Sequence, residues 1–169
     1  MHRSFETVVF SHGKESGPWG SKITAMAAVA RDLGCDVVSV DYQGIDDPGA
    51  RVDKLIASGR SLPGPLVLVG SSMGGHVSAA AAARLQARAL FLLAPAFYMP
   101  GFEAFTPVDV PCPAEIVHGW SDDIVPIANS IRWAAERRAA LHILDSDHRL
   151  QNRIDEIVTN FRRFLQALE

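Results

Sequence analysis

One run near the middle of the chain constrains its fold more than any other feature. It reads Leu66-Val67-Leu68-Val69-Gly70-Ser71-Ser72-Met73-Gly74-Gly75-His76, and an alanine-rich stretch follows. The consecutive apolar residues are typical of a strand buried on both faces, and alanine has the highest helix propensity. The run therefore predicts a buried strand, a tight turn containing Gly-x-Ser-x-Gly, and a helix in immediate succession.

The serine in that turn is a candidate nucleophile. A serine hydroxyl is weakly nucleophilic, and a sharp strand-to-helix turn projects it toward both a base and a substrate carbonyl. Gly70 and Gly74 lack a Cβ and so permit the close packing that such a turn needs. The backbone N–H of Met73 falls at a helix N-terminus, where it can stabilise a developing oxyanion. We therefore expect Ser72 to be the nucleophile and Met73 to be one oxyanion donor.

Glycine-rich turns between a strand and a helix also bind phosphate groups. A Walker-type loop is excluded, because no Gly-Lys-Ser or Gly-Lys-Thr follows the turn. A dinucleotide fingerprint is disfavoured, because the turn follows the third predicted strand and not the first.

Strand-like and helix-like segments alternate along the chain. The expected strands are Thr7–Ser11, Asp36–Asp41, Leu66–Gly70, Ala89–Leu93, Ala114–His118 and Leu141–Leu144. The expected helices are Lys22–Leu33, Arg51–Ala57, Val77–Leu85, Ile127–Arg138 and Ile154–Leu168. This alternation predicts a three-layer, doubly wound α/β fold with a parallel sheet of about six strands. Neither an internal repeat nor a change of composition divides the chain, so we expect residues 1–169 to form a single domain.

The composition narrows the possible partners. The net charge is -3 and no basic cluster stands out, so neither a nucleic-acid surface nor a polybasic membrane anchor is expected. The run Val8-Val9-Phe10 is too short for a signal-peptide core, and no membrane-spanning apolar segment follows. Cys35 and Cys112 have no metal-ligand spacing. We expect a cytoplasmic protein with reduced thiols, no metal and no organic cofactor.

A nucleophilic serine of this kind needs an acid and then a histidine, each after a later strand. Asp122 follows the predicted strand Ala114–His118 in a turn that leads to a helix near Pro126. Its neighbour Asp123 is the competing acid, and either residue alternatively caps the helix or forms the turn. His148 follows the last predicted strand, and no other histidine comes after the acid at the end of a strand. We favour Asp122 as the acid and His148 as the base.

The loop after the first predicted strand should supply a second oxyanion donor. Gly13 allows this loop to turn sharply, and the backbone N–H of Lys14 is the preferred donor, with that of Gly13 as the alternative. His12 is expected to brace the loop through hydrogen bonds and is also a candidate for the wall of the substrate pocket.

The stretch Pro95–Pro113 interrupts the alternation of strands and helices. It contains five prolines and several aromatic residues, so an ordered loop is expected beyond the carboxyl edge of the sheet, where ligands bind. Aromatic and apolar side chains here and after the fifth strand either wall an open acyl pocket or seal the sheet's edge, and the sequence leaves both readings open. These residues are Phe97, Tyr98, Met99, Phe102 and Trp120.

In combination these motifs resemble the α/β-hydrolase superfamily. In chain order the matching pieces are Ser11-His12-Gly13, Gly70-Ser71-Ser72-Met73-Gly74-Gly75, His118-Gly119-x-x-Asp122-x-x-Val125-Pro126 and His148. The size is similar to that of the compact, lidless esterase-like branch, which includes YqiA-like and retinoblastoma-binding-protein-like serine hydrolases. The resemblance implies the sheet order 2-1-3-4-5-6, with neither a cap domain nor the additional amino-terminal antiparallel strands of larger members.

The expected activity is hydrolysis of a small carboxylic ester or thioester through an acyl-enzyme on Ser72. Two alternatives stay open: a catalytically weak binding or regulatory protein with the same fold, and an acyltransferase. The expected partner is a small-molecule acyl substrate, and the sequence leaves the oligomeric state open.

Overall fold

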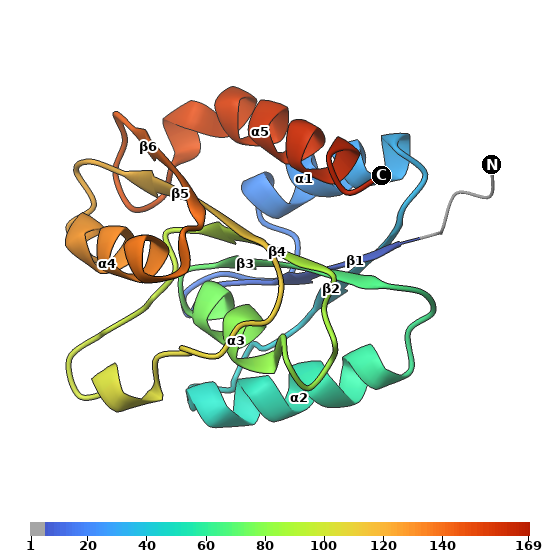
Figure 1. Cartoon of the computed structure of the whole chain (residues 1–169), viewed down its shortest axis with the longest axis horizontal. Helices are drawn as coiled ribbons and strands as arrows, with labels where there is room; N and C mark the ends of the chain where they lie inside the picture. Colours follow the sequence, from blue (N-terminus) through green and yellow to red (C-terminus); the bar gives the residue numbers. More distant parts are fainter. Residues whose placement is uncertain (1–5) are drawn as a thin grey trace.

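A six-stranded parallel sheet forms the centre of the computed structural model, which describes residues 6–169 (Figure 1). The strand order is β2-β1-β3-β4-β5-β6. The strands are β1 (Thr7–Ser11), β2 (Asp36–Val40), β3 (Leu66–Ser71), β4 (Ala89–Leu93), β5 (Ala114–Gly119) and β6 (Ala140–Leu144). The doubly wound α/β fold and the strand order are confirmed, and residues 6–169 contain no cap domain.

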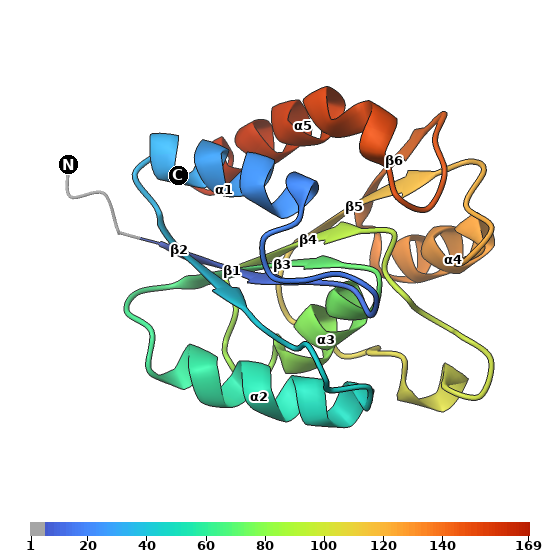
Figure 2. The same cartoon turned by 180° about the vertical axis from the view of Figure 1, so that it is seen from behind.

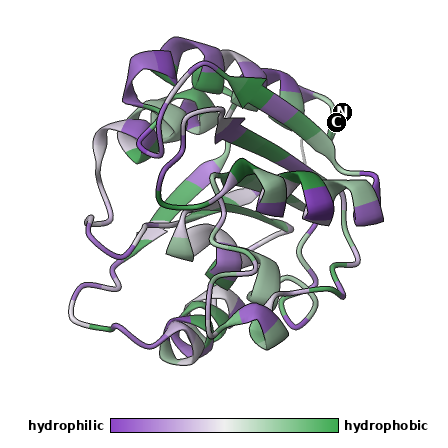
Figure 3. Cartoon of the chain, turned by 90° about the vertical axis from the view of Figure 1, so that its left-hand side faces the viewer, coloured by the Kyte–Doolittle hydropathy of each residue, from purple (hydrophilic) through white to green (hydrophobic). Residues whose placement is uncertain are grey.

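Helices cover both faces of the sheet. Helices α1 (Ser21–Asp32) and α5 (Ile154–Gln166) lie on one face, and α2 (Pro48–Arg60), α3 (Met73–Ala81) and α4 (Ile127–Arg137) lie on the other (Figures 1 and 2). Two short 3-10 turns, η1 (Glu103–Phe105) and η2 (Gln151–Arg153), interrupt the loops. Figure 3 shows green, apolar segments along the strands and purple, polar ones on the helices and loops around them.

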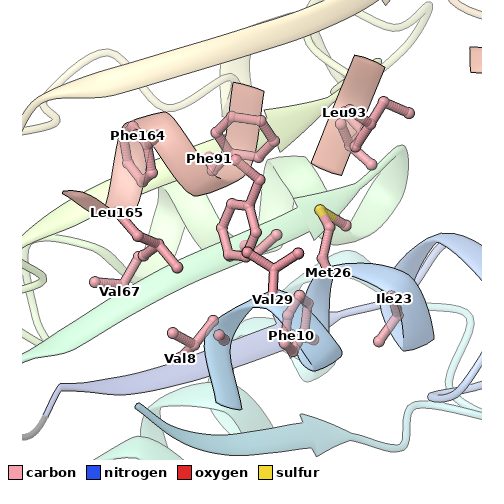
Figure 4. Packing of buried hydrophobic residues seen from close by; sticks show 14 of the residues in the cluster. Val8, Phe10, Ile23, Met26, Val29, Val67, Phe91, Leu93, Phe164 and Leu165 are labelled. Atoms are coloured by element: carbon pink, nitrogen blue, oxygen red, sulfur yellow. The ribbon is translucent and has the colours of Figure 1, made fainter. Parts of the chain in front are cut away.

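The core has two parts because the sheet separates them. Apolar side chains of α1 and α5 pack against one face (Figure 4), and residues of α2, α3 and α4 pack against the other. Every residue of β1 and β4 is buried, as expected for central strands covered on both sides.

Helices α2 and α3 begin three or four residues earlier than the sequence predicted, and α1 begins one residue earlier. Helix α2 begins at Pro48 because Asp47 caps it: the Asp47 carboxylate accepts a hydrogen bond of 2.7 Å from the backbone N–H of Ala50. Proline is favoured at the first helical position, so the Asp-Pro pair was a capping signal that the apolar pattern alone did not reveal. Helix α3 begins at Met73, directly after Ser72, and the glycines at its start are therefore helical.

The stretch Pro95–Pro113 is a loop that leaves the carboxyl end of β4, as predicted, and contains η1. It then returns to the amino end of β5, where the Pro113 carbonyl accepts a hydrogen bond from the Leu90 N–H, and on the way it is tied to α4. The side chain of Asn129 donates a hydrogen bond of 2.8 Å to the Phe97 carbonyl, and the Trp133 indole donates one of 2.7 Å to the Pro107 carbonyl. Within the part of the chain that the structure describes, no helix is both long enough and apolar enough to span a membrane.

Candidate active site

The turn between β3 and α3 holds Ser72 in a conformation that non-glycine residues rarely adopt. Its φ is 54° and its ψ is -118°. Hydrogen bonds fix this geometry: the Ser72 N–H donates to the Leu93 carbonyl over 2.9 Å, and the Ser72 carbonyl accepts from Ala96 N–H over 2.9 Å. Backbone strain of this kind persists only where the surroundings determine it, and it is frequent at active sites.

Glycine is required on both sides of this serine. A Cβ at Gly70 would lie 2.1 Å from the Gly74 carbonyl oxygen, and a Cβ at Gly74 would lie 2.0 Å from the Ser11 carbonyl oxygen. The two glycines therefore let β3 and α3 approach each other and β1, which places Ser72 at the carboxyl edge of the sheet.

Three side chains from three separate loops meet at this edge. His148 Nε2 lies 3.0 Å from Ser72 Oγ, and His148 Nδ1 lies 2.7 Å from Asp122 Oδ2. An ionised carboxylate only accepts hydrogen bonds, so Nδ1 carries the proton and the free Nε2 accepts from the Ser72 hydroxyl. The structure thus brings together Ser72, His148 and Asp122, the three residues that the sequence pointed to as nucleophile, base and acid.

Asp122 both forms a turn and holds the histidine. Its Oδ1 accepts hydrogen bonds from the backbone N–H groups of Ile124, at 2.9 Å, and Val125, at 2.8 Å, while Oδ2 faces His148. Burial raises the pKa of Asp122, but the hydrogen bonds from His148 and from the two backbone N–H groups outweigh it, so the pKa is lowered overall. Asp123 is exposed, and α4 begins after Pro126 without a side-chain cap, so the capping role considered for Asp123 is not seen.

A second histidine lies behind this carboxylate. His118, at the end of β5, is fully buried, with its Nε2 3.0 Å from Asp122 Oδ2 and 3.0 Å from the Val125 carbonyl oxygen. Its Nδ1 lies 2.7 Å from Ser130 Oγ. Nε2 faces acceptors only and therefore carries the proton, while Nδ1 accepts from the Ser130 hydroxyl; burial lowers the pKa of His118 and favours this neutral form.

Sequence reasoning did not find the contact between His118 and the Asp122 carboxylate. The spacing of four residues between His118 and Asp122, across the end of a strand, was the only signal for it. That spacing does not show which way a buried imidazole points.

The loop after β1 lies beside Ser72. A Cβ at Gly13 would lie 3.5 Å from Ser72 Cβ. His12 is 1% exposed: its Nδ1 donates to the Gly13 carbonyl over 2.7 Å, and its Nε2 accepts from the Tyr42 N–H over 2.8 Å. Burial lowers the pKa of His12, in keeping with a neutral ring. His12 braces the loop, and its burial leaves it no surface for a substrate; the side chain of Lys14 is exposed.

The apolar pocket candidates separate into packed and exposed residues. Phe97 is fully buried and stacks on Trp133 with ring centroids 4.7 Å apart, so the structure places it in the core and not in a pocket wall. Tyr98 and Met99 are half-buried, and the guanidinium of Arg132 lies 4.0 Å from the centre of the Tyr98 ring. The large exposed aromatic surfaces among the candidates belong to Phe102 and Trp120.

Across residues 6–169, no group of three or more His, Cys, Asp or Glu side chains is arranged to hold a metal ion.

Known proteins share this architecture. The model of the alpha/beta hydrolase family matches residues 8–167. An alpha/beta superfamily protein from Xanthomonas campestris pv. campestris is 33% identical, with a TM-score of 0.88 over 96% of this chain and 99% of that one.

More distant structures share the fold. Alpha/beta hydrolase domain-containing protein 10 from mouse is 22% identical, with a TM-score of 0.84 over 96% of this chain and 90% of that one. A serine hydrolase without a lid from Xanthomonas campestris is 21% identical, with a TM-score of 0.73 over 96% of this chain and 81% of that one. No curated protein matches the chain. From the family match across nearly its whole length, the chain belongs to the alpha/beta hydrolase family.

Proposed function

We propose that the protein is a serine hydrolase that cleaves a small carboxylic ester or thioester through an acyl-enzyme on Ser72. The observation that carries this proposal is the continuous hydrogen-bonded chain from Ser72 Oγ through the His148 imidazole to Asp122 Oδ2. In such an arrangement the histidine is a base that accepts the proton of the serine hydroxyl, and the aspartate fixes the orientation of the histidine.

In the first half-reaction Ser72 Oγ attacks the acyl carbon while its proton moves to His148 Nε2. Asp122 stabilises the imidazolium that forms and keeps Nδ1 as the donor. The tetrahedral oxyanion accepts hydrogen bonds from the backbone N–H of Met73, which has no partner within the helix, and from that of Lys14 or Gly13. His148 then protonates the leaving alcohol or thiol, and the acyl group stays on Ser72.

In the second half-reaction water replaces the alcohol. His148 Nε2 removes a proton from water as its oxygen attacks the acyl carbon, and returns that proton to Ser72 Oγ as the carboxylic acid leaves. Ser72, His148 and Asp122 thus return to their starting state. The Ser72 hydroxyl proton and one proton of water have both passed through His148 Nε2.

The test is turnover of p-nitrophenyl esters and acyl thioesters of increasing chain length by the wild-type protein and two neighbouring serine variants. We expect Ser72→Ala to abolish turnover and Ser71→Ala, one residue earlier in the same turn, to retain it. Equal turnover by wild type and Ser72→Ala would contradict the proposal. Products formed with added alcohols or amines would identify an acyltransferase, and a folded wild-type protein without turnover would favour a binding role.

A further inference from the structure

A buried cation in the first turn of α2 is the feature that the proposed mechanism leaves unexplained. Arg51 is 1% exposed. Its guanidinium contacts backbone carbonyls: Nε donates to Ile45 O over 2.7 Å, and Nη1 lies 3.2 Å from both His12 O and Gly13 O. Within residues 6–169 it forms no ion pair with a carboxylate, and the Tyr42 ring lies 5.3 Å from its Cζ.

Electrostatics alone disfavours a cation at this position. A buried charge is costly when no carboxylate contacts it, and the first turn of a helix carries the positive end of the helix dipole. The Asp46 carboxylate favours the cation only through the longer-range field, and burial still lowers the pKa of Arg51. Backbone carbonyls compensate the guanidinium directly, and two of them, those of His12 and Gly13, belong to the loop that lies beside Ser72.

The geometry of the peptide unit links this contact to the active site. The Gly13 carbonyl and the Lys14 N–H belong to one planar peptide, as do the His12 carbonyl and the Gly13 N–H. In a trans peptide the carbonyl and the N–H point in opposite directions. Because Arg51 holds both carbonyls on its own side, both N–H groups are directed away from Arg51. These are the two candidate amides for the second oxyanion donor.

We propose that Arg51 is a positioning residue for the oxyanion hole, which fixes the two peptides of the loop after β1 so that their N–H groups meet the developing oxyanion. The inference rests on the proposed hydrolase function. A charged donor on a carbonyl oxygen also withdraws electron density from the peptide, so the N–H at its other end becomes a stronger donor. His12 Nδ1 acts on the same Gly13 oxygen from a second direction.

The test compares Arg51→Met, Arg51→Lys and a control on the same helix, Lys54→Met. Lys54 is exposed and donates to the Asp41 carbonyl at the surface. Because loss of one oxyanion donor reduces kcat by about 100- to 1000-fold, we expect Arg51→Met to lower kcat by about 10- to 100-fold. KM should stay within about threefold, since the loop acts on the transition state and not on the bound ester. For Arg51→Lys we expect a smaller decrease in kcat than for Arg51→Met, because the ammonium keeps the positive charge. Some decrease should remain, because lysine lacks the planar set of N–H donors of arginine. Lys54→Met should match wild type.

A second measurement separates positioning from general damage to the fold. A boronic acid forms a tetrahedral adduct with a nucleophilic serine, so its inhibition constant should rise by the same factor by which kcat/KM falls. Circular dichroism and thermal unfolding establish which variants are folded. If Arg51→Met does not fold, Arg51→Lys decides: a reduced kcat at unchanged KM supports the inference, and wild-type kcat contradicts it.

The outcomes also separate this inference from the proposed function. A folded Arg51→Met variant with wild-type kcat would overturn the positioning role alone, leaving Ser72-dependent hydrolysis in place. Wild-type turnover that does not depend on Ser72 would overturn both.

Discussion

At the scale of single residues, the carboxylate of Asp122 shows how closely the candidate chemistry depends on one hydrogen-bonding pattern. Oδ1 accepts from the backbone of its own turn, and Oδ2 accepts from His148 with His118 Nε2 3.0 Å away. The turn fixes the carboxylate, and the carboxylate fixes the imidazole. Two functions that seemed to be alternatives in the sequence are therefore performed by one side chain.

Replacing Asp122 with asparagine tests this pattern. The turn requires an acceptor at the Oδ1 position, so the asparagine NH₂ group would face the two histidines and meet donors. His148 Nδ1 would then accept a hydrogen bond from the asparagine NH₂ group and lose its proton. The ring proton would move to Nε2, which could no longer take a proton from Ser72. We expect kcat to fall by about 10⁴-fold for Asp122→Asn, with the fold retained. Steady-state kinetics and circular dichroism provide the measurement.

The matched control is the neighbouring exposed aspartate. Asp123→Asn should keep wild-type kcat, because α4 begins after Pro126 without a side-chain cap. If Asp123→Asn lost as much activity as Asp122→Asn, the assignment of the acid would be wrong.

The sequence carried unequal information about individual residues. Ser72 and His148 could be identified because each has a distinctive place after a strand. Asp122 and Asp123 could not be separated with certainty, because their difference is which carboxylate points into the site. The buried contacts of His118 and Arg51 were missed: the Arg51 contact with Gly13 spans 38 positions, and no local pattern encodes it.

At the scale of secondary-structure elements, close approach of backbones determines the site. A Cβ at Gly74 would meet the Ser11 carbonyl of β1, and neither backbone can move without disturbing the sheet. We therefore expect Gly74→Ala to lower the free energy of unfolding by about 3 kcal/mol or more, and to reduce Ser72-dependent turnover as well. Urea unfolding followed by circular dichroism measures the first effect.

Gly20→Ala provides the comparison, because a Cβ at Gly20 would have no atom within 4 Å and its φ is -63°. Its free energy of unfolding should change by less than about 1 kcal/mol. Equal effects of the two substitutions would show that the tight packing around the turn does not determine stability.

Element boundaries depended on different signals from element identities. The alternation of apolar strands and amphipathic helices was enough to predict the type and order of β1–β6 and α1–α5, but not the 3-10 turns η1 and η2. The start of α2 is marked by the Asp47-Pro48 cap. At the start of α3, Gly74 and Gly75 are glycines because β1 and Pro95 leave no room for a Cβ, so their low helix propensity did not mark the end of the turn. Steric requirements of this kind come from neighbours that are distant in the sequence.

At the scale of the whole molecule, buried histidines make stability depend on pH. His12, His76 and His118 are at most 8% exposed, and burial lowers the pKa of each below the usual 6.5. Below pH 6.5 these histidines bind protons in the unfolded chain but not in the native state, and this favours unfolding. The native state therefore keeps its full stability above pH 6.5 and loses part of it as pH falls toward the native pKa values.

Urea titrations from about pH 7.5 to about pH 5.5 should therefore show a falling free energy of unfolding, by up to about 1.4 kcal/mol per pH unit for each histidine. Carboxyl groups with the usual pKa values of 3.8 and 4.5 stay ionised over this range. Burial raises the pKa of Glu6, which acts in the opposite direction, but three histidines act against this one carboxyl group. A free energy of unfolding that stayed constant or rose on acidification would show that these rings are not held neutral.

The proposal as a whole depends on Ser72 being a nucleophile activated by His148. The most direct measurement is labelling with a fluorophosphonate probe, which forms a covalent adduct with an activated serine, followed by mass spectrometry of the peptides. The predicted result is one adduct on the peptide containing Ser72 and no adduct in the folded Ser72→Ala variant. Failure of the wild-type protein to react, or equal labelling of Ser72→Ala, would contradict it.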